Sequence, residues 1–181
     1  MWRTMQLMLL ALMLLPLSLG ADDNTVDFDA DVAFASFRTF AIKDGKIDSA
    51  RPEVNNSLVA NSLKKAIRDE LVTRGLKETA DKPDILIQYI IDATEYSVGS
   101  GGRANPIGPG RGGRAERGGS TATPVDFIEG ILVIDVSTAQ PAQLVWRGVY
   151  RDDEKNSAKF AQKLTGDARK LLSQYPPKKK S

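Results

Sequence analysis

The chain has 181 residues, with 25 lysines and arginines against 23 aspartates and glutamates, which gives a formal net charge of +2. It contains no histidine and no cysteine, so Ser-His-Asp and Cys-His catalysis, histidine or thiolate zinc sites and disulfides are excluded. Carboxylate, lysine and tyrosine chemistry and the binding of hard cations through oxygen atoms stay open. The balanced charge argues against a general nucleic-acid-binding protein, which usually carries a basic excess.

The first twenty residues have the pattern of a secretory signal peptide. Arg3 precedes an apolar stretch over residues 7–17, and small residues surround Gly20. The stretch is shorter than the roughly 20 apolar residues that a spanning helix needs. We therefore predict cleavage after Gly20 or Ala21 and export to the periplasm as a soluble protein with no membrane span. No cysteine follows the cleavage site, so we do not expect a lipoprotein.

Three elements are predicted in the first half of the exported chain. Short strands at residues 26–28 and 38–42 precede a helix at residues 54–73, whose apolar side chains recur at helical spacing. They are Val59, Leu63, Ala66, Ile67 and Leu71. Gly75, followed by apolar Leu76, is expected to end this helix in a left-handed cap.

Strands are then predicted on both sides of a glycine-rich insert. Residues 85–91 are apolar on both faces, which indicates a central strand. Residues 99–120 contain many glycines, two prolines and four arginines and are predicted to be disordered. Residues 127–136 and 143–150 predict an antiparallel hairpin.

The hairpin strands carry apolar residues or glycine at nearly all even positions, which predicts one buried face. A register with Ile134 opposite Trp146 would set large side chains against small ones along that face. The same alternation places Trp146 in the core with Leu144 and Gly148, rather than at a recognition surface with Arg147.

A final helix is predicted at residues 157–174 and ends before Pro176. Its apolar stripe consists of Phe160, Leu164, Ala168, Leu171, Leu172 and Tyr175. Gly166 inside the helix costs about 1 kcal/mol relative to alanine, which indicates either close packing or a weak point.

Together these elements predict one α+β domain over residues 21–177, with the insert at about 99–120 and a basic disordered tail at 178–181. The simplest architecture is a mainly antiparallel sheet with both amphipathic helices on one face. Without cysteines, such a domain depends on packing for its stability.

Alternating carboxylates near the start of the domain resemble the beginning of a calcium loop. Asp27, Asp29 and Asp31 match its first three ligand positions. Val32 replaces the glycine at the sixth position and Arg38 the glutamate at the twelfth, so we predict no metal site and assign the aspartates to a solvent-facing strand edge.

The insert contains two other motif-like patterns. Gly108, Gly110 and Gly113 have dinucleotide-loop spacing, but no helix pattern follows, so no cofactor is predicted. The arginines resemble RNA-binding segments but lack aromatic partners, and export separates them from RNA. The arginines therefore predict one candidate site, a contact to another kind of polyanion through Arg103, Arg111, Arg114 and Arg117.

A second acidic group, Asp152, Asp153 and Glu154, ends the hairpin. These residues could hold a cation. We expect instead that they lie just before the final helix and favour its positive amino end.

Several short motifs occur in an order that resembles domain of unknown function 4136, over about residues 26–177. They are Phe37-Arg38-Thr39-Phe40-Ala41, Leu71-Val72-Thr73-Arg74-Gly75-Leu76, Ala80-Asp81-Lys82-Pro83-Asp84-Ile85, Glu129-Gly130-Ile131-Leu132-Val133-Ile134-Asp135, Trp146-Arg147-Gly148 and Tyr175-Pro176-Pro177. The resemblance implies a bacterial envelope protein with a glycine-rich insert. Members are often lipoproteins, and the absent cysteine departs from that pattern. The family supplies no catalytic residues to carry over.

We therefore expect a non-enzymatic binding or structural accessory of the envelope, whose partner is a protein or an anionic polymer. One alternative is a small hydrolase or transferase that uses carboxylates or lysine. Another is polyanion binding through the insert and the tail, which would weaken steeply with salt.

Overall fold

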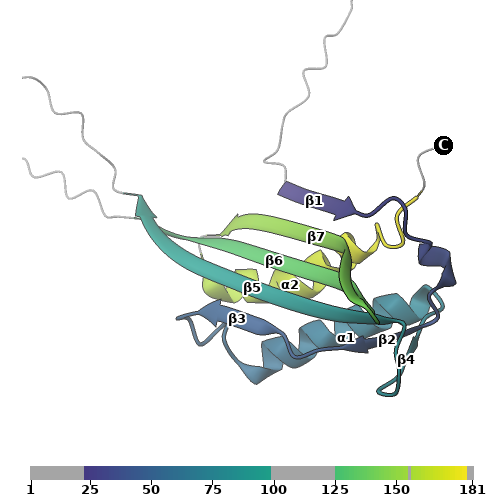
Figure 1. Cartoon of the computed structure of the whole chain (residues 1–181). Helices are drawn as coiled ribbons and strands as arrows, with labels where there is room; N and C mark the ends of the chain where they lie inside the picture. Colours follow the sequence, from purple (N-terminus) through teal and green to yellow (C-terminus); the bar gives the residue numbers. More distant parts are fainter. Residues whose placement is uncertain (1–22, 99–124, 155, 179–181) are drawn as a thin grey trace, which may run out of the picture.

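A computed structural model describes residues 23–98, 125–154 and 156–178 of the chain (Figure 1). The signal peptide, the insert and the end of the basic tail were predicted on residues that lie outside these ranges. Within the described ranges, no helix is both long and apolar enough to cross a membrane.

The described residues form one seven-stranded sheet and two α-helices, so the fold is of the α+β class. The strand order is β1-β7-β6-β5-β2-β4, and β3 also pairs with β5. In chain order the elements are β1 (Asp23–Phe28), the 3-10 turn η1 (Phe34–Ser36), β2 (Thr39–Ile42), β3 (Lys46–Ser49), α1 (Ser57–Thr73), β4 (Lys77–Glu78), β5 (Ile85–Val98), β6 (Val125–Ala139), β7 (Ala142–Glu154) and α2 (Ser157–Leu172).

The sheet is mixed, so the predicted mainly antiparallel sheet is wrong. Strands β5, β6, β7 and β1 pair antiparallel, whereas β2 and β3 both run parallel to β5, and β4 runs parallel to β2. The cause is α1, which lies between β3 and β5 in the chain. A helical crossover returns the chain in the same direction, and parallel pairing results.

Helix α1 begins and ends through local contacts. The Asn56 side chain accepts a hydrogen bond from the Val59 N–H at 3.0 Å, which satisfies one free donor of the first turn. At the other end Gly75 has φ +86°, and the N–H of Leu76 donates to the Leu71 carbonyl. Leu76 is buried, so the predicted left-handed cap is confirmed.

The hairpin of β6 and β7 buries the predicted face in a different register. Trp146 is 1% exposed, as predicted, but it lies opposite Val136, and Ile134 lies opposite Gly148. The register shifts between Val136 and Ser137, where Val145 is an extra residue on β7. The bulge buries Val145 and leaves Leu144 44% exposed, so the prediction of Leu144 beside Trp146 was wrong.

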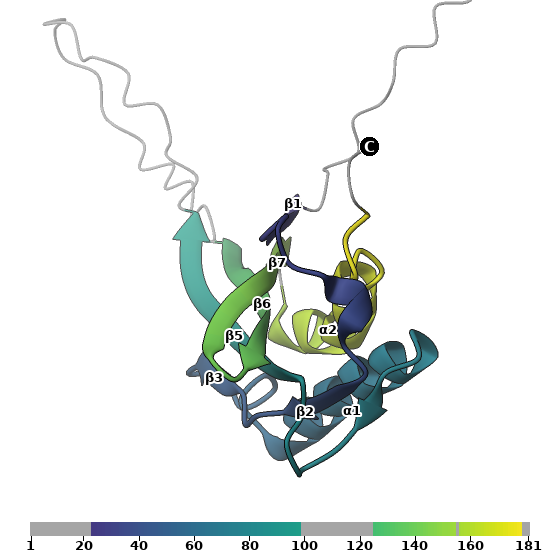
Figure 2. The same ribbon diagram turned by 45° about the vertical axis from the view of Figure 1, so that its right-hand side comes forward.

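Helix α2 packs against β6 and β7, and α1 packs against α2 (Figure 2). Asn156 caps α2 by accepting hydrogen bonds from the N–H groups of Ala158 and Lys159. Close approach depends on a glycine in β6, because a Cβ on Gly130 would lie 2.1 Å from the ring of Phe160. The helix ends at Leu172, two residues earlier than predicted, and Tyr175 continues its buried stripe.

Candidate functional site

The arginines proposed to contact a polyanion lie outside the described residues. Arg103, Arg111, Arg114 and Arg117 all belong to the segment between β5 and β6. Their role therefore stays a prediction from sequence.

The alternating aspartates shape the chain as it leaves β1. Asp29 Oδ1 accepts a hydrogen bond from the Asp31 N–H at 3.0 Å, which forms a turn closed by the side chain. The backbone N–H of Asp29 donates to the Val145 carbonyl at 3.0 Å. Asp27 and Asp31 are exposed. Asp29 therefore has a local structural role in ending the strand.

The acidic group at the end of β7 binds a lysine of α2. Asp152 and Glu154 both contact Lys163 Nζ, with Glu154 at 2.8 Å. The group lies just before α2, as predicted, and the side chain that caps the helix is Asn156. Hydrogen bonds to Asp152 and Glu154 raise the pKa of Lys163 well above its ordinary value. A nucleophilic lysine needs the opposite shift, so this cluster favours a structural ion pair.

Arg147 faces away from its neighbour Trp146. Its guanidinium donates two hydrogen bonds of 2.7 Å to the Asp135 carboxylate on β6. This bidentate pair raises the pKa of Arg147 and ties β7 to β6. The buried indole and the paired arginine therefore belong to different faces of the sheet.

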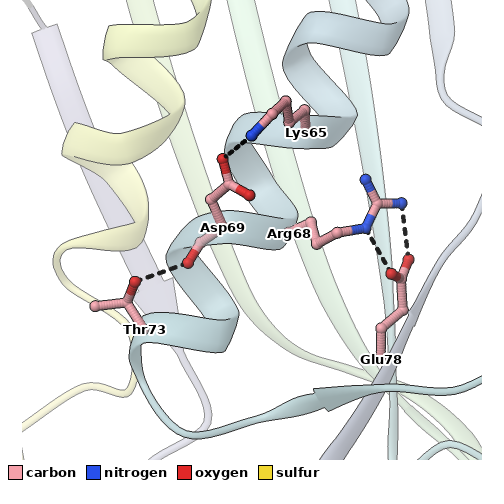
Figure 3. Close-up of polar contacts among 5 residues, drawn as sticks. All are labelled: Lys65, Arg68, Asp69, Thr73 and Glu78. Carbon is pink, nitrogen blue, oxygen red and sulfur yellow. Dashed lines mark hydrogen bonds and ion pairs between the residues drawn. The ribbon is translucent and has the colours of Figure 1, made fainter.

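Arg68 connects α1 to the edge strand β4, and the other polar contacts drawn in Figure 3 lie within α1. Arg68 forms two hydrogen bonds to Glu78 of β4, at 2.5 Å and 3.0 Å. Lys65 pairs with Asp69 at 2.6 Å, and the Thr73 hydroxyl donates to the Asp69 carbonyl. Each of these side chains is engaged within the fold.

An apolar cleft surrounds the two prolines that follow α2, and we call it the proline cleft. One side is a hollow of about 270 Å³ and the other a hollow of about 410 Å³, and both share Phe28, Pro176 and Pro177. The first is also lined by Ala30, Val32, Ala33, Phe34 and Ala35, and the second by Val26, Ser173, Gln174 and Lys178. The cleft thus joins β1, η1 and the segment after α2.

Aromatic rings form the support of the proline cleft. Phe34 packs edge-on against Phe28 at 6.3 Å and against Tyr175 at 5.8 Å between ring centroids. Tyr175 in turn contacts Trp146 at 5.7 Å. Edge-to-face pairs of rings stabilise such a cluster beyond the area that they bury, so the cleft rests on a packed aromatic support.

Two polar atoms in this support are buried without a partner among the described residues. They are the Tyr175 hydroxyl and the Trp146 Nε1. Burial raises the pKa of the Tyr175 phenol above its ordinary value. An unsatisfied buried donor costs free energy, so the packing of the aromatic cluster must offset both of these costs.

Two further hollows lie elsewhere on the described surface. One, of about 420 Å³, lies between the amino-terminal halves of α1 and α2, and Leu58 on its rim is 77% exposed. The other, of about 460 Å³, has Asp48, Asp92 and Glu95 on its walls, and Glu95 is paired with Arg51.

Sequence reasoning missed the cleft because its walls are far apart in the chain. Phe28 and Phe34 lie near the start of the domain, and Pro176 and Pro177 near its end. The available signal was the run of apolar residues at Val32, Phe34 and Phe37, which has no helical or strand period.

Comparison with solved structures shows similarity of fold. A PDZ domain protein from Parabacteroides distasonis ATCC 8503 matches with a TM-score of 0.58 and 18% identity, over 88% of this chain. The chain spans only 36% of that protein's length. A DUF4136 family protein from Bacteroides thetaiotaomicron VPI-5482 has a TM-score of 0.56 and 17% identity, over 86% of this chain and 96% of the other.

A weaker likeness is to the PelC dodecamer from Paraburkholderia phytofirmans, with a TM-score of 0.45 and 11% identity over 83% of this chain and 96% of that one. No curated protein matches the chain. Residues 24–177 match the family described as domain of unknown function (DUF4136). This match covers nearly the whole described domain, and the chain belongs to the DUF4136 family.

Proposed function

We propose that this protein is an exported accessory of the bacterial envelope that binds another component through the proline cleft and catalyses no reaction. The observation that carries the proposal is the chemistry of the cleft. Lys178 is the one ionisable side chain among its described lining residues, and the others are mainly alanine, valine, phenylalanine and proline. An apolar hollow with few polar groups suits binding, whereas acid–base catalysis needs positioned titratable groups.

Location in the periplasm is part of the same proposal. It is supported by the basic, apolar and small-residue pattern of residues 1–20. A protein kept in that compartment without cysteine would present the cleft independently of redox conditions.

We also infer that both helices cover one face of the sheet, which leaves the proline cleft at its β1 side. Phe160 of α2 contacts the position of Gly130 in β6. Lys64 of α1 is close enough to Tyr89 of β5 to oppose the rise that burial causes in the pKa of that tyrosine. Tyr89 lies opposite Ile134, which shares the face of Gly130 on β6.

Site-specific photocrosslinking in the intact envelope tests the binding proposal. A photoreactive residue in place of Ala35 on the cleft wall should yield discrete adducts that disappear with Ala33→Phe, which fills the hollow. The matched control replaces Val72, which is exposed on α1 away from the cleft. Adducts of equal yield from both positions, or a catalysed turnover lost on mutation of one acidic residue, would contradict the proposal.

The arginines of the insert support a second proposal, polyanion binding. Residues 99–120 carry four arginines and one acidic residue, Glu116. Binding to an anionic envelope polymer should weaken steeply as salt rises, because bound counterions are released. If binding to the polymer were retained after deletion of residues 99–120, the insert would be excluded as the polyanion-binding segment.

A further inference from the structure

The free edge of β1 lies beside the proline cleft. Among the described strands β1 is outermost in the sheet, and it pairs there with β7 alone, over six residues. The Asp29 N–H donates to the Val145 carbonyl, and hydrogen-bonded and non-bonded pairs alternate along an antiparallel ladder. The odd-numbered residues of β1 therefore bond to β7. The backbone N–H and C=O groups of Asn24, Val26 and Phe28 point to the free edge.

The side chains of the same residues belong to the cleft side of β1. Val26 and Phe28 line the hollow of about 410 Å³, together with Pro176 and Pro177. Asn24 Oδ1 accepts a hydrogen bond from Gln174 Nε2 at 3.1 Å, which holds the segment after α2 against β1. A strand added to this edge would place every second side chain next to the hollow.

The charged side chains on β1 and just after it determine which kind of strand could be added to this edge. Asp27 and Asp31 are exposed and have no ion-pair partner in the described parts of the chain. Arg147 lies opposite Asp27 in the ladder, but its guanidinium is bound by Asp135. A second copy of β1 would bring like charges together, which disfavours pairing between two copies.

We propose that the proline cleft receives an extended peptide in which basic and apolar residues alternate, added as a strand to the free edge of β1. This proposal rests on the binding function proposed above and names its partner class. Backbone hydrogen bonds to Asn24, Val26 and Phe28 hold the peptide. Its apolar side chains enter the hollow, and its basic side chains lie on the face of Asp27.

The test is titration of the full chain with a fluorescent eight-residue peptide that alternates lysine and valine. Two further peptides carry N-methyl groups on one or the other alternate set of residues. Strand addition uses only one set of N–H groups, so one methylated peptide should lose affinity by about tenfold or more and the other should retain it. Equal affinity of both methylated peptides and the unmodified peptide would overturn the proposal.

Variants of the protein test the same edge. Val26→Pro removes an N–H that points outward and preserves the ladder to β7, so affinity should fall by about tenfold at unchanged folding. Asp27→Pro is the matched control, since it removes a ladder N–H and should lower the unfolding temperature. If Val26→Pro does not fold, the proposal is tested by the N-methylated peptides titrated into the wild-type protein.

Three other outcomes would also overturn the proposal. A glutamate–valine peptide that binds as tightly would exclude selection by charge. A concentration-dependent dimer abolished by Val26→Pro would assign the edge to a second copy. If the peptide bound only after deletion of residues 178–181, the natural occupant of the β1 edge would be the chain's own tail. In each case, adducts from position 35 that disappear with Ala33→Phe would still support the binding function, whereas their absence would reject it.

Discussion

The two edges of the sheet differ in length and in what covers them. At the β4 edge only Lys77 and Glu78 pair with β2, and Arg68 of α1 binds Glu78 across the edge. At the β1 edge six residues pair with β7, and an apolar hollow adjoins their free side. A short, charge-paired edge offers little template for another strand, whereas a long edge must be protected or used.

The β1 side, which we propose as the recognition side, therefore combines the longer strand edge with an apolar hollow. Its aspartates disfavour pairing between copies, and its aromatic support fixes the cleft in place. The β4 side gives the guanidinium of Arg68 and the carboxylate of Glu78 to an ion pair within the fold.

The largest expected loss of stability comes from adding a side chain to β6 where α2 packs closely against it. Gly130→Ala should destabilise the protein by about 1–3 kcal/mol, because its Cβ would overlap the Phe160 ring. Since Pro176 and Pro177 follow α2, crosslinking at the proline cleft should weaken as well. Denaturant unfolding measures the stability change. A stability within 0.5 kcal/mol of wild type, about the usual scatter of surface substitutions, would show that α2 can shift without cost.

Asp84 tests the β4 side through pH. Its carboxylate accepts hydrogen bonds from the N–H groups of Arg38 and Thr39, which lower its pKa from the ordinary 3.8. A lowered pKa means that the stabilisation is complete above pH 3.8 and is lost as pH falls through the lower folded value. Asp84→Ala should cost about 1 kcal/mol at neutral pH.

The difference in unfolding free energy between wild type and Asp84→Ala should therefore become smaller in acid. At neutral pH the two proteins should bind the lysine–valine peptide with the same affinity. A gap that is constant from pH 7 to below 3.8 would show that the carboxylate charge is not what the two N–H groups recognise.

Gly166→Ala should raise stability by about 0.5–1 kcal/mol, because Gly166 lies in α2 with nothing within 4 Å of an added Cβ. It is the matched control for Gly130→Ala, because the same substitution is expected to change the stability in the opposite direction. Thermal unfolding measures it. A loss of stability would mean that the position makes a contact important for packing.

The smallest effect is expected at the Arg68–Glu78 pair. Both side chains are more than a third exposed, so Arg68→Ala should cost only about 0.2–1 kcal/mol, and less at high salt. The variant uncovers the β4 edge and should still not bind the lysine–valine peptide, because two residues are too short a template. Binding gained by Arg68→Ala would show that edge cover, rather than length, separates the two edges.

Patterns that depend on neighbours in the chain were predicted well. The spacing of apolar residues indicated α1, Gly75 its end, and alternation the burial of Trp146. Each of these depends on contacts within a few residues, or on which face a strand buries.

Features that depend on distant contacts were not predicted. The register of β7 depends on the bulge at Val145, and one inserted residue changes every later pairing. The parallel pairing of β2 with β5 depends on how α1 crosses the sheet. The proline cleft needs Phe28 and Pro176 to meet, and no local pattern encodes that contact.

Backbone hydrogen exchange with and without saturating lysine–valine peptide tests the central claim most directly. The account predicts that the amides of Asn24, Val26 and Phe28 become protected, because only their N–H groups point to the free edge. Thr25 and Asp27 already bond to β7 and should change little, as should Lys77 and Glu78 at the other edge. Unchanged exchange at Val26 and Phe28, or new protection confined to the β4 edge, would contradict it.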